Sequence, residues 1–187
     1  MDSALLVARR WCSGQIIDDR PALAHAVRVA VTIGVHQPIA APQIIAAALL
    51  HDAPEFAPPD LDLDRFLSTE YGPEVRRLIR GMQFEHDALD RDEPTIPDPD
   101  DVNLILLSTA DKVVALTSLL RRAHLSGDTA AFFTTRTPLL NLLTHFSKCR
   151  RAAIGAVPAS MTADLGKVLD ALGTATAVAR RRQAARS

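Results

Sequence analysis

Apolar residues recur at helical rather than alternating spacing along this chain, and that spacing restricts the fold class more than any other feature. Alanine and leucine dominate the apolar residues, and aromatic residues make up only 4% of the chain. Prolines and glycines separate the apolar runs into segments of helical length. The sequence therefore predicts an all-α protein, and no strand is convincing.

Eight helices are expected, at Ser3–Ser13, Ala22–Gly34, Pro42–Asp52, Asp64–Glu70, Pro73–Met82, Asp101–Leu125, Pro138–Ala153 and Ser160–Arg182. Pro42 and Pro73 suit a first helical turn, where a missing N–H would have no partner. Pro54 disfavours helical backbone at Ala53, so the pair His51–Asp52 is expected in a final helical turn. The acidic, proline-rich segment Glu85–Asp100 is expected to be a surface loop.

At 187 residues the chain has the length of one domain, residues 1–187, able to bury roughly 70% of its unfolded surface. The polar residues discussed below fall within about residues 5–122. Helices 138–182 and a basic tail, 183–187, follow. Leu139, Leu140, Leu142, Leu143 and Phe146 recur at helical spacing, which favours core packing, with a homodimer surface as the alternative reading.

Charge, cysteines and hydropathy exclude several classes of function. A net charge of -1 argues against binding to bulk nucleic acid. Cys12 and Cys149 form no CxxC pair and no signal segment opens the chain, so a reducing cytoplasm is expected. No uninterrupted apolar run reaches the roughly 20 residues that a membrane span needs. We therefore expect a soluble cytoplasmic protein with no membrane partner.

The most informative local feature is His51–Asp52, which ends the apolar run Ala47–Leu50. Burying a histidine and a carboxylate there costs several kcal/mol unless something pairs with them. His25 and Asp111 lie in similar apolar settings. Together they form a set of two histidines and two aspartates that could hold one divalent cation.

Each of these residues also has a simpler interpretation. A lone histidine on an apolar helix face, such as His25, is usually a satisfied core residue. Asp111 could pair with the adjacent Lys112, but neighbours in a helix point about 100° apart. A mixed nitrogen and oxygen set suits manganese or iron better than a closed zinc site. Such a metal would activate water for phosphoester or diphosphate hydrolysis.

Three charged residues are candidates for the chemistry around the metal. Glu55, three residues beyond Asp52, could orient or deprotonate the attacking water, or it could be an exposed loop carboxylate. Arg28 and Lys112 are the cations best placed by sequence to contact phosphate oxygens. Both could equally be solvated surface charges.

The chain resembles the HD-domain metal-dependent phosphohydrolases. More narrowly, it resembles the hydrolase domain of RelA/SpoT-type alarmone enzymes and the small alarmone hydrolases. The stretches that carry the resemblance occur in the family's order; they are Ser13–Gln15, Pro21–Ala30, Ala47–Glu55, Tyr71–Met82 and Thr109–Val113. The resemblance implies a helical HD-type domain. It also implies metal ligation by His25, His51, Asp52 and Asp111.

In that family the metal is typically manganese, and the enzymes remove a 3'-diphosphate from a hyperphosphorylated nucleoside, releasing pyrophosphate. The resemblance therefore implies a (p)ppGpp- or (p)ppApp-like alarmone as substrate, with Asp52 and Glu55 in the catalytic centre. Arg28 and Lys112 are expected to contact the substrate.

Three positions depart from the family pattern. Gln15 is followed by Ile16–Pro21, not by the usual arginine-lysine-aspartate segment, and the stretch is one residue shorter. Phe56 replaces the second of two paired acids, and Ala115 replaces an asparagine. Two alternatives therefore stay open: an HD-type nucleoside monophosphatase, and a nucleotide-sensing helical module with weak or no turnover.

Overall fold

Proline and capping side chains set where several helices begin. In the computed structural model, which describes residues 3–17 and 19–185, Pro42 and Pro73 lie in the first turns of their helices. The carboxylates of Asp62 and Asp101 accept hydrogen bonds from the backbone N–H groups of Arg65 and Leu104. These caps satisfy N–H groups that have no partner within the helix.

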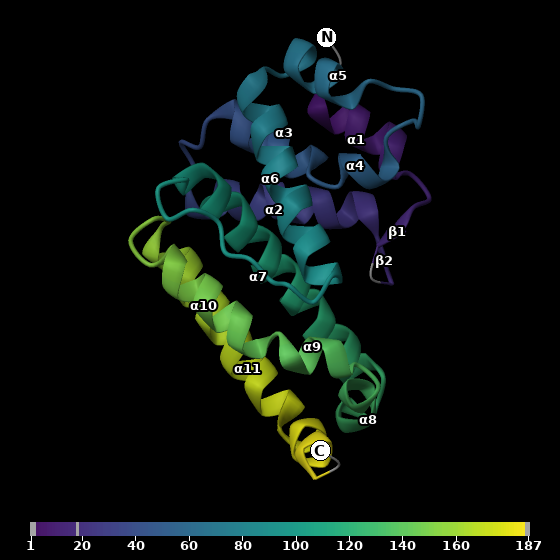
Figure 1. The fold of residues 1–187 in the computed structure, drawn as a ribbon, viewed down its shortest axis with the longest axis vertical. Coiled ribbons are helices and arrows are strands. Elements are labelled where there is room, and N and C mark those ends of the chain that lie inside the picture. The colour runs from purple at the N-terminus through teal and green to yellow at the C-terminus, as the bar shows by residue number, and fades with distance from the viewer. Residues whose placement is uncertain (1–2, 18, 186–187) are drawn as a thin grey trace.

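The described residues form eleven helices and one short hairpin (Figure 1). In chain order the elements are α1 (Ala4–Cys12), β1 (Ile16–Ile17), β2 (Arg20–Pro21), α2 (Ala22–His36), α3 (Pro42–Leu50), α4 (Ala53–Phe56), α5 (Leu63–Glu70), α6 (Pro73–Asp90), α7 (Val102–Leu125), α8 (Thr129–Thr134), α9 (Thr137–Asn141), α10 (Leu143–Ala153) and α11 (Ala159–Ala184). The all-α prediction is confirmed. The hairpin pairs Ile16 with Pro21 and Ile17 with Arg20.

The predicted end of α6 is wrong. The helix continues past Met82 to Asp90, through residues expected to form a loop. Glu85 is only 2% exposed and forms an ion pair with Lys112 of α7, while Ala88 packs into the interior. These tertiary contacts stabilise helical backbone in a segment whose acidic composition suggested a loop.

Other boundaries differ for local reasons. The helix expected over Pro138–Ala153 is divided at Leu142 into α9 and α10. α8 was not predicted, although the Asp128 carboxylate caps it by accepting from the N–H of Ala131. Of the predicted basic tail, residues 186 and 187 lie outside the described residues.

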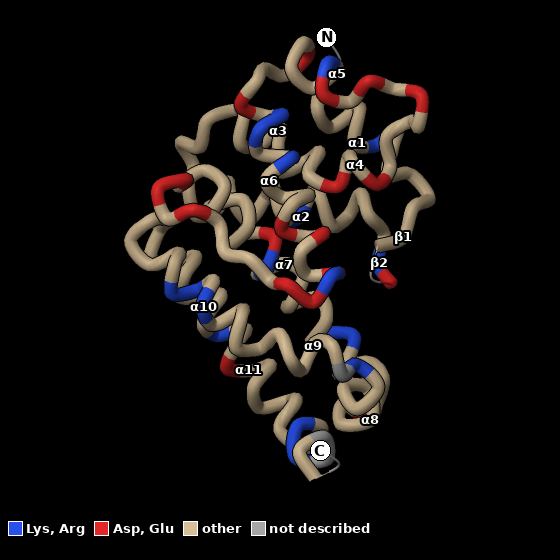
Figure 2. Tube along the Cα trace, in the orientation of Figure 1, with Lys and Arg blue, Asp and Glu red and all other residues tan. Residues whose placement is uncertain are grey.

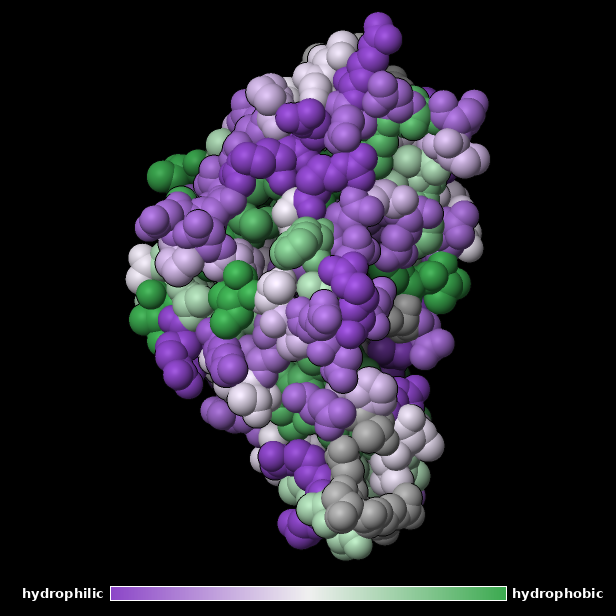
Figure 3. Space-filling model, in the orientation of Figure 1, coloured by the Kyte–Doolittle hydropathy of each residue, from purple (hydrophilic) through white to green (hydrophobic). Residues whose placement is uncertain are grey.

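Two hydrophobic clusters form the core, and α7 connects them. The first cluster packs α1, α2, α3 and α6 against the N-terminal half of α7, and the second packs α8, α10 and α11 against its C-terminal half. Figure 1 shows α1–α6 at one end of the molecule and α8–α11 at the other. Leu140 and Phe146 are buried in the second cluster, which supports the core interpretation of the leucine-rich segment. On the face drawn in Figure 3, exposed apolar side chains are scattered among hydrophilic ones.

α7 is the one helix among the described residues that is long and apolar enough to cross a membrane. Most of its apolar window is buried inside the protein, and Asp111 and Lys112 lie within it. The same length and composition are expected of the central helix of a folded core. We therefore treat α7 as the core helix that joins the two clusters.

An ion-pair network joins the start of α6 to the start of α7. Arg77 donates to both Glu74 oxygens at 2.8 Å and also pairs with Asp101, while Asn103 donates to Glu74 at 3.0 Å. The hydrogen bond from Arg77 lowers the pKa of Glu74 from 4.5 to about 2, with burial opposing and Asn103 assisting. Figure 2 shows how acidic and basic residues are distributed along the chain around these helices.

Replacing Glu74 by glutamine is expected to lower the free energy of unfolding by less than about 1 kcal/mol, because the partners are more than one third exposed. A lowered pKa contributes stability above pH 4.5 that is lost as pH falls through about 2. Urea unfolding at pH 6 and pH 3 should show a smaller difference between wild type and Glu74→Gln at pH 3. Glu93→Gln, on an exposed residue, is the control, and an equal difference at both pH values would contradict this account.

Candidate metal centre

Three helices bring the four predicted metal ligands together. His25 lies on α2, His51 and Asp52 follow the last residue of α3, and Asp111 lies in the middle of α7. All four residues are buried, with exposed fractions of 2%, 1%, 3% and 8% in that order. The prediction that Ala53 is not helical is wrong, because Ala53 begins α4. Pro54 has no N–H to donate to the carbonyl of Leu50, so α3 ends there, and His51 and Asp52 occupy the turn between α3 and α4.

The ligand atoms converge on one another. His25 Nε2 lies 2.9 Å from Asp111 Oδ1 and 3.2 Å from His51 Nε2. His51 Nε2 lies 3.2 Å from Asp52 Oδ1 and 3.7 Å from Asp111 Oδ1. Two nitrogens and two carboxylates thus face one point, although their chain positions span 86 residues from His25 to Asp111.

The hydrogen bonds around the cluster leave ligand atoms available. His51 Nδ1 lies 2.8 Å from the carbonyl oxygen of Ala48 and must donate to it. In a neutral imidazole the lone pair is then on Nε2, which faces the cluster. Among the described residues, neither carboxylate oxygen of Asp52 accepts a hydrogen bond. A buried carboxylate without such partners is costly, and a cation would offset that cost.

The electrostatics of the cluster also favour a cation. Burial lowers the pKa of His51, but the carboxylates of Asp52 and Asp111 outweigh burial and raise it to about 9. Burial raises the pKa of Asp111, but the imidazoles of His25, His51 and His86 outweigh burial and hold it well below its usual range. Positive charge is thus stabilised at this point. His25, His51 and Asp52 offer ligand atoms that all lie within 4.8 Å of one another, close enough to hold one divalent metal ion. Asp111 lies beside the two histidines of this group.

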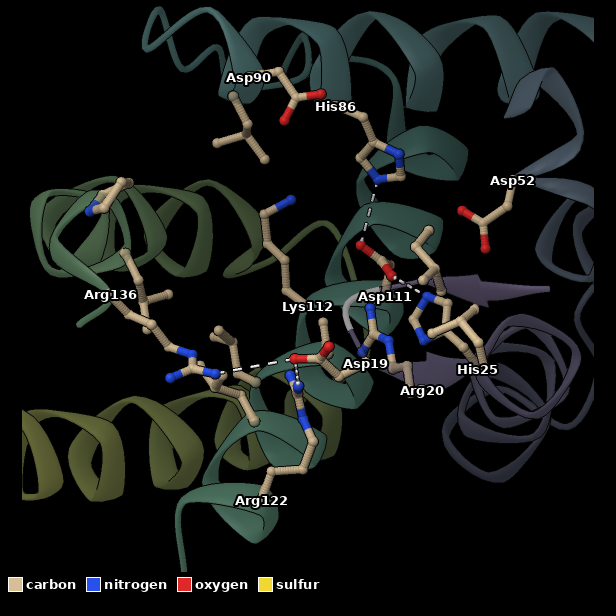
Figure 4. A pocket seen from close by; sticks show the side chains of 18 of the residues that line it. Asp19, Arg20, His25, Asp52, His86, Asp90, Asp111, Lys112, Arg122 and Arg136 are labelled. Atoms are coloured by element: carbon tan, nitrogen blue, oxygen red, sulfur yellow. Dashed lines mark hydrogen bonds and ion pairs between the residues drawn. The ribbon is translucent and has the colours of Figure 1, made fainter. Parts of the chain in front are cut away.

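His86 is a member of the cluster that the sequence prediction missed. Its Nε2 lies 3.6 Å from Asp111 Oδ2, and its side chain approaches from α6 (Figure 4). Burial lowers the pKa of His86, and the Asp111 carboxylate outweighs burial and raises it. The signal was available in the helical spacing, because His86 follows the buried residues Ile79 and Met82 at i+7 and i+4.

Three of the four predicted ligands border a cavity of about 750 Å³. His25, Asp52 and Asp111 line it together with Glu55, and apolar walls come from residues such as Leu116 and Phe146 of the second cluster. A cavity of this volume accommodates a small molecule such as a nucleotide.

Three arginines line the same cavity, from segments far apart in the chain: Arg20 of β2, Arg122 of α7 and Arg136 between α8 and α9. The sequence prediction did not single out these arginines, because no local pattern relates them. Figure 4 shows Arg122 and Arg136 across the cavity from Asp52, with Asp19 between them.

Of two other candidates, Glu55 and Arg28, only Glu55 lies at the cavity. Glu55 lines the cavity and is exposed to solvent, and its role in handling the attacking water stays a prediction. Arg28 is exposed on α2 and is not one of the described residues that line the cavity, so the structure does not bring it to the site. At position i+3 from His25 it points about 60° away from that side chain.

Lys112 lines the cavity but is engaged in a buried cluster behind it. Its ammonium group pairs with Glu85 and donates to Ser108 Oγ at 2.8 Å. Burial lowers the pKa of Lys112, but the Glu85 carboxylate outweighs burial and raises it. His145 and Cys149 complete the cluster, with Cys149 Sγ 3.3 Å from His145 Nε2. The phosphate contact predicted for Lys112 stays a prediction.

Comparison with known structures identifies the fold. The chain is similar to a solved structure described as a metazoan orthologue of SpoT that hydrolyses ppGpp and plays a role in starvation responses. The TM-score is 0.58, the sequence identity is 18%, and the similarity covers 91% of this chain and 93% of that chain. No family model and no curated protein sequence matches. The chain therefore shares the all-α fold of that ppGpp hydrolase, which agrees with the helical HD-type domain that the sequence resemblance implied.

Proposed function

We propose that this protein is a metal-dependent phosphohydrolase that removes the 3'-diphosphate from a small (p)ppGpp- or (p)ppApp-like nucleotide. One observation carries the proposal: His25, His51, Asp52 and Asp111 converge on one point at the wall of a cavity that three arginines also line. Such a cavity offers a cation at one side and guanidinium groups at the other for an anionic nucleotide. The HD-type fold supports the same reaction class.

The two histidines and two aspartates would hold the metal, for which manganese is the expected ion. When bound, this ion lowers the pKa of a coordinated water and offsets charge on phosphoryl oxygens. Asp52 belongs to the catalytic centre because its carboxylate faces both the cluster and the cavity. Lys112 borders the same cavity and is retained as a substrate contact, whereas Arg28 is not.

Glu55 acts on the attacking water. Its carboxylate takes a proton as the water oxygen bonds to the phosphorus attached to the ribose 3' oxygen. The bond between that phosphorus and the 3' oxygen breaks, and pyrophosphate leaves carrying the new oxygen. The proton on Glu55 is then available to the 3' oxygen, which becomes a hydroxyl group.

A nucleotide-binding module without turnover is the second candidate, because two departures from the family pattern lie beside the site. Phe56 packs against the first core cluster where the family has a second acid, and Ala115 lines the cavity where the family has an asparagine. Both changes remove polar groups near the water or the nucleotide and leave the metal cluster intact.

A product assay separates these functions. The purified protein is incubated with Mn²⁺ and ppGpp, ppApp, GMP or AMP, and pyrophosphate and phosphate are quantified. We expect pyrophosphate from the 3'-diphosphates. Phosphate from the monophosphates alone would identify a nucleoside monophosphatase, and nucleotide binding with neither product would identify the sensing module.

Replacing Glu55 by glutamine is expected to lower kcat by about 10²- to 10⁴-fold, because the carboxylate that accepts the proton is lost. The metal content should remain at the wild-type level, since Glu55 is not a ligand. Steady-state kinetics and metal analysis on the same preparation check both parts. A kcat within twofold of wild type would remove Glu55 from the mechanism.

A further inference from the structure

A second charged group lies across the cavity from the metal cluster. Arg122 Nη1 donates to Asp19 Oδ2 at 3.0 Å, and Arg136 Nη2 lies 4.0 Å from the same oxygen. Asp19 belongs to the turn between β1 and β2, 103 residues before Arg122. Three separate segments thus meet at one carboxylate oxygen on the cavity wall (Figure 4).

Arg136 has contacts of its own besides Asp19, Arg122 is largely buried, and the Asp19 carboxylate is exposed. The Arg136 guanidinium stacks 3.7 Å from the centre of the Phe132 ring and donates to the Phe132 carbonyl at 2.9 Å. Arg122 is only 22% exposed, and its buried Nε has no hydrogen-bond partner among the described residues. Asp19 is 77% exposed. An exposed carboxylate in an ion pair exchanges readily, because such pairs contribute at most about 1 kcal/mol.

A phosphate group satisfies this pair of arginines better than one carboxylate oxygen does. Guanidinium groups bind phosphate through several parallel N–H···O bonds, and a phosphate offers three terminal oxygens. Asp19 Oδ2 is within hydrogen-bond distance of Arg122 and beyond it for Arg136. The two guanidinium groups therefore have N–H donors that do not bond Asp19 and could bond a larger anion in the cavity.

We propose that Arg122 and Arg136 form a distal anion subsite that binds a second phosphate group of the substrate, and that Asp19 occupies this subsite in the free protein. The assignment of that group to a nucleotide 5'-phosphate rests on the proposed function. The subsite favours substrates that carry phosphate at both ends of the nucleoside over those phosphorylated only at the 3' position. Binding of the 5'-phosphate displaces Asp19 toward solvent.

Binding of guanosine 5'-diphosphate to the Mn²⁺-loaded full-length protein tests the subsite without turnover. By calorimetry, Arg122→Gln and Arg136→Gln should each weaken binding about 10- to 100-fold, the range expected for a lost charged hydrogen bond. Asp19→Asn should tighten binding about 2- to 5-fold, because asparagine tolerates the left-handed backbone at this position, φ 59°, and removes the competing charge. Arg121→Gln, on the exposed neighbour of Arg122, should bind as wild type does.

Kinetics with two substrates give the second test. Arg136→Gln should lower kcat/KM for ppGpp by about 10-fold or more, and for guanosine 3'-diphosphate by less than about 3-fold. The subsite would be overturned if Arg136→Gln lowered kcat/KM equally for both substrates. It would also be overturned if Arg122→Gln and Arg136→Gln bound guanosine 5'-diphosphate as wild type does, or if Asp19→Asn bound it more weakly. Absence of pyrophosphate from both substrates in wild type would overturn the proposed function, and the binding experiment would still decide the subsite. Arg136 and Asp19 are the more exposed positions, so their variants decide the test if Arg122→Gln does not fold.

Discussion

Replacing Asp52 or Asp111 by alanine is expected to abolish turnover and metal content together. Each substitution removes one of the four proposed ligands, and a bound metal ion would contribute several kcal/mol to stabilising the transition state. A loss of about 4 kcal/mol corresponds to a decrease in rate of about 10³-fold. Pyrophosphate release and metal stoichiometry measured on the same preparations check both effects.

Asp90→Asn is the matched control for this experiment. Asp90 is an acidic residue that lines the same cavity, but it is not one of the four predicted ligands. This variant should retain metal at the wild-type stoichiometry. The proposed metal centre would be refuted if Asp52→Ala and Asp111→Ala also retained it.

The largest expected effect on stability comes from the buried pair of Lys112 and Glu85. Lys112→Met leaves the Glu85 carboxylate buried without its cation, and Glu85 Oε2 already has no hydrogen-bond partner among the described residues. Breaking a buried pair in this way costs about 3–5 kcal/mol. Urea or thermal unfolding of the variant measures the loss.

The double variant Lys112→Met with Glu85→Leu should recover most of that stability, because replacing both members of a buried pair by apolar residues is often neutral. Lys167→Met is the control; Lys167 pairs with Asp164 at 2.8 Å but is 78% exposed, so its loss should change the free energy of unfolding by no more than about 0.5 kcal/mol. A double variant as unstable as Lys112→Met alone would contradict the pairing. The folded double variant also tests the phosphate contact predicted for Lys112, because loss of that contact would raise the KM for the substrate.

The four candidate metal ligands could be singled out because each one conflicts with its own surroundings in the sequence. His25, His51, Asp52 and Asp111 are polar residues in apolar helical runs, and only burial with a partner resolves that conflict. The helical class followed from the same runs, since their spacing does not depend on distant contacts. The structure brings these four residues to one point, as their shared setting suggested.

Contacts made by distant residues could not be predicted in the same way. From the sequence, Glu85 is expected at the start of an acidic loop. In the structure it pairs with Lys112, 27 residues later, and the local sequence does not predict that contact. The end of α6 depends on that contact. Arg122 and Arg136 line the cavity together and approach Asp19, which lies more than 100 residues earlier in the chain, and the spacing of residues in the sequence does not predict such a contact.

Titration of Mn²⁺ into metal-depleted protein, with pyrophosphate release from ppGpp followed at each addition, tests the central claim most directly. One ion held by His25, His51, Asp52 and Asp111 predicts no release without metal and a linear increase up to one ion per chain, followed by a plateau. Release of pyrophosphate at full rate from metal-depleted protein, or no release at any Mn²⁺ concentration, would contradict a metal-dependent phosphohydrolase at this site.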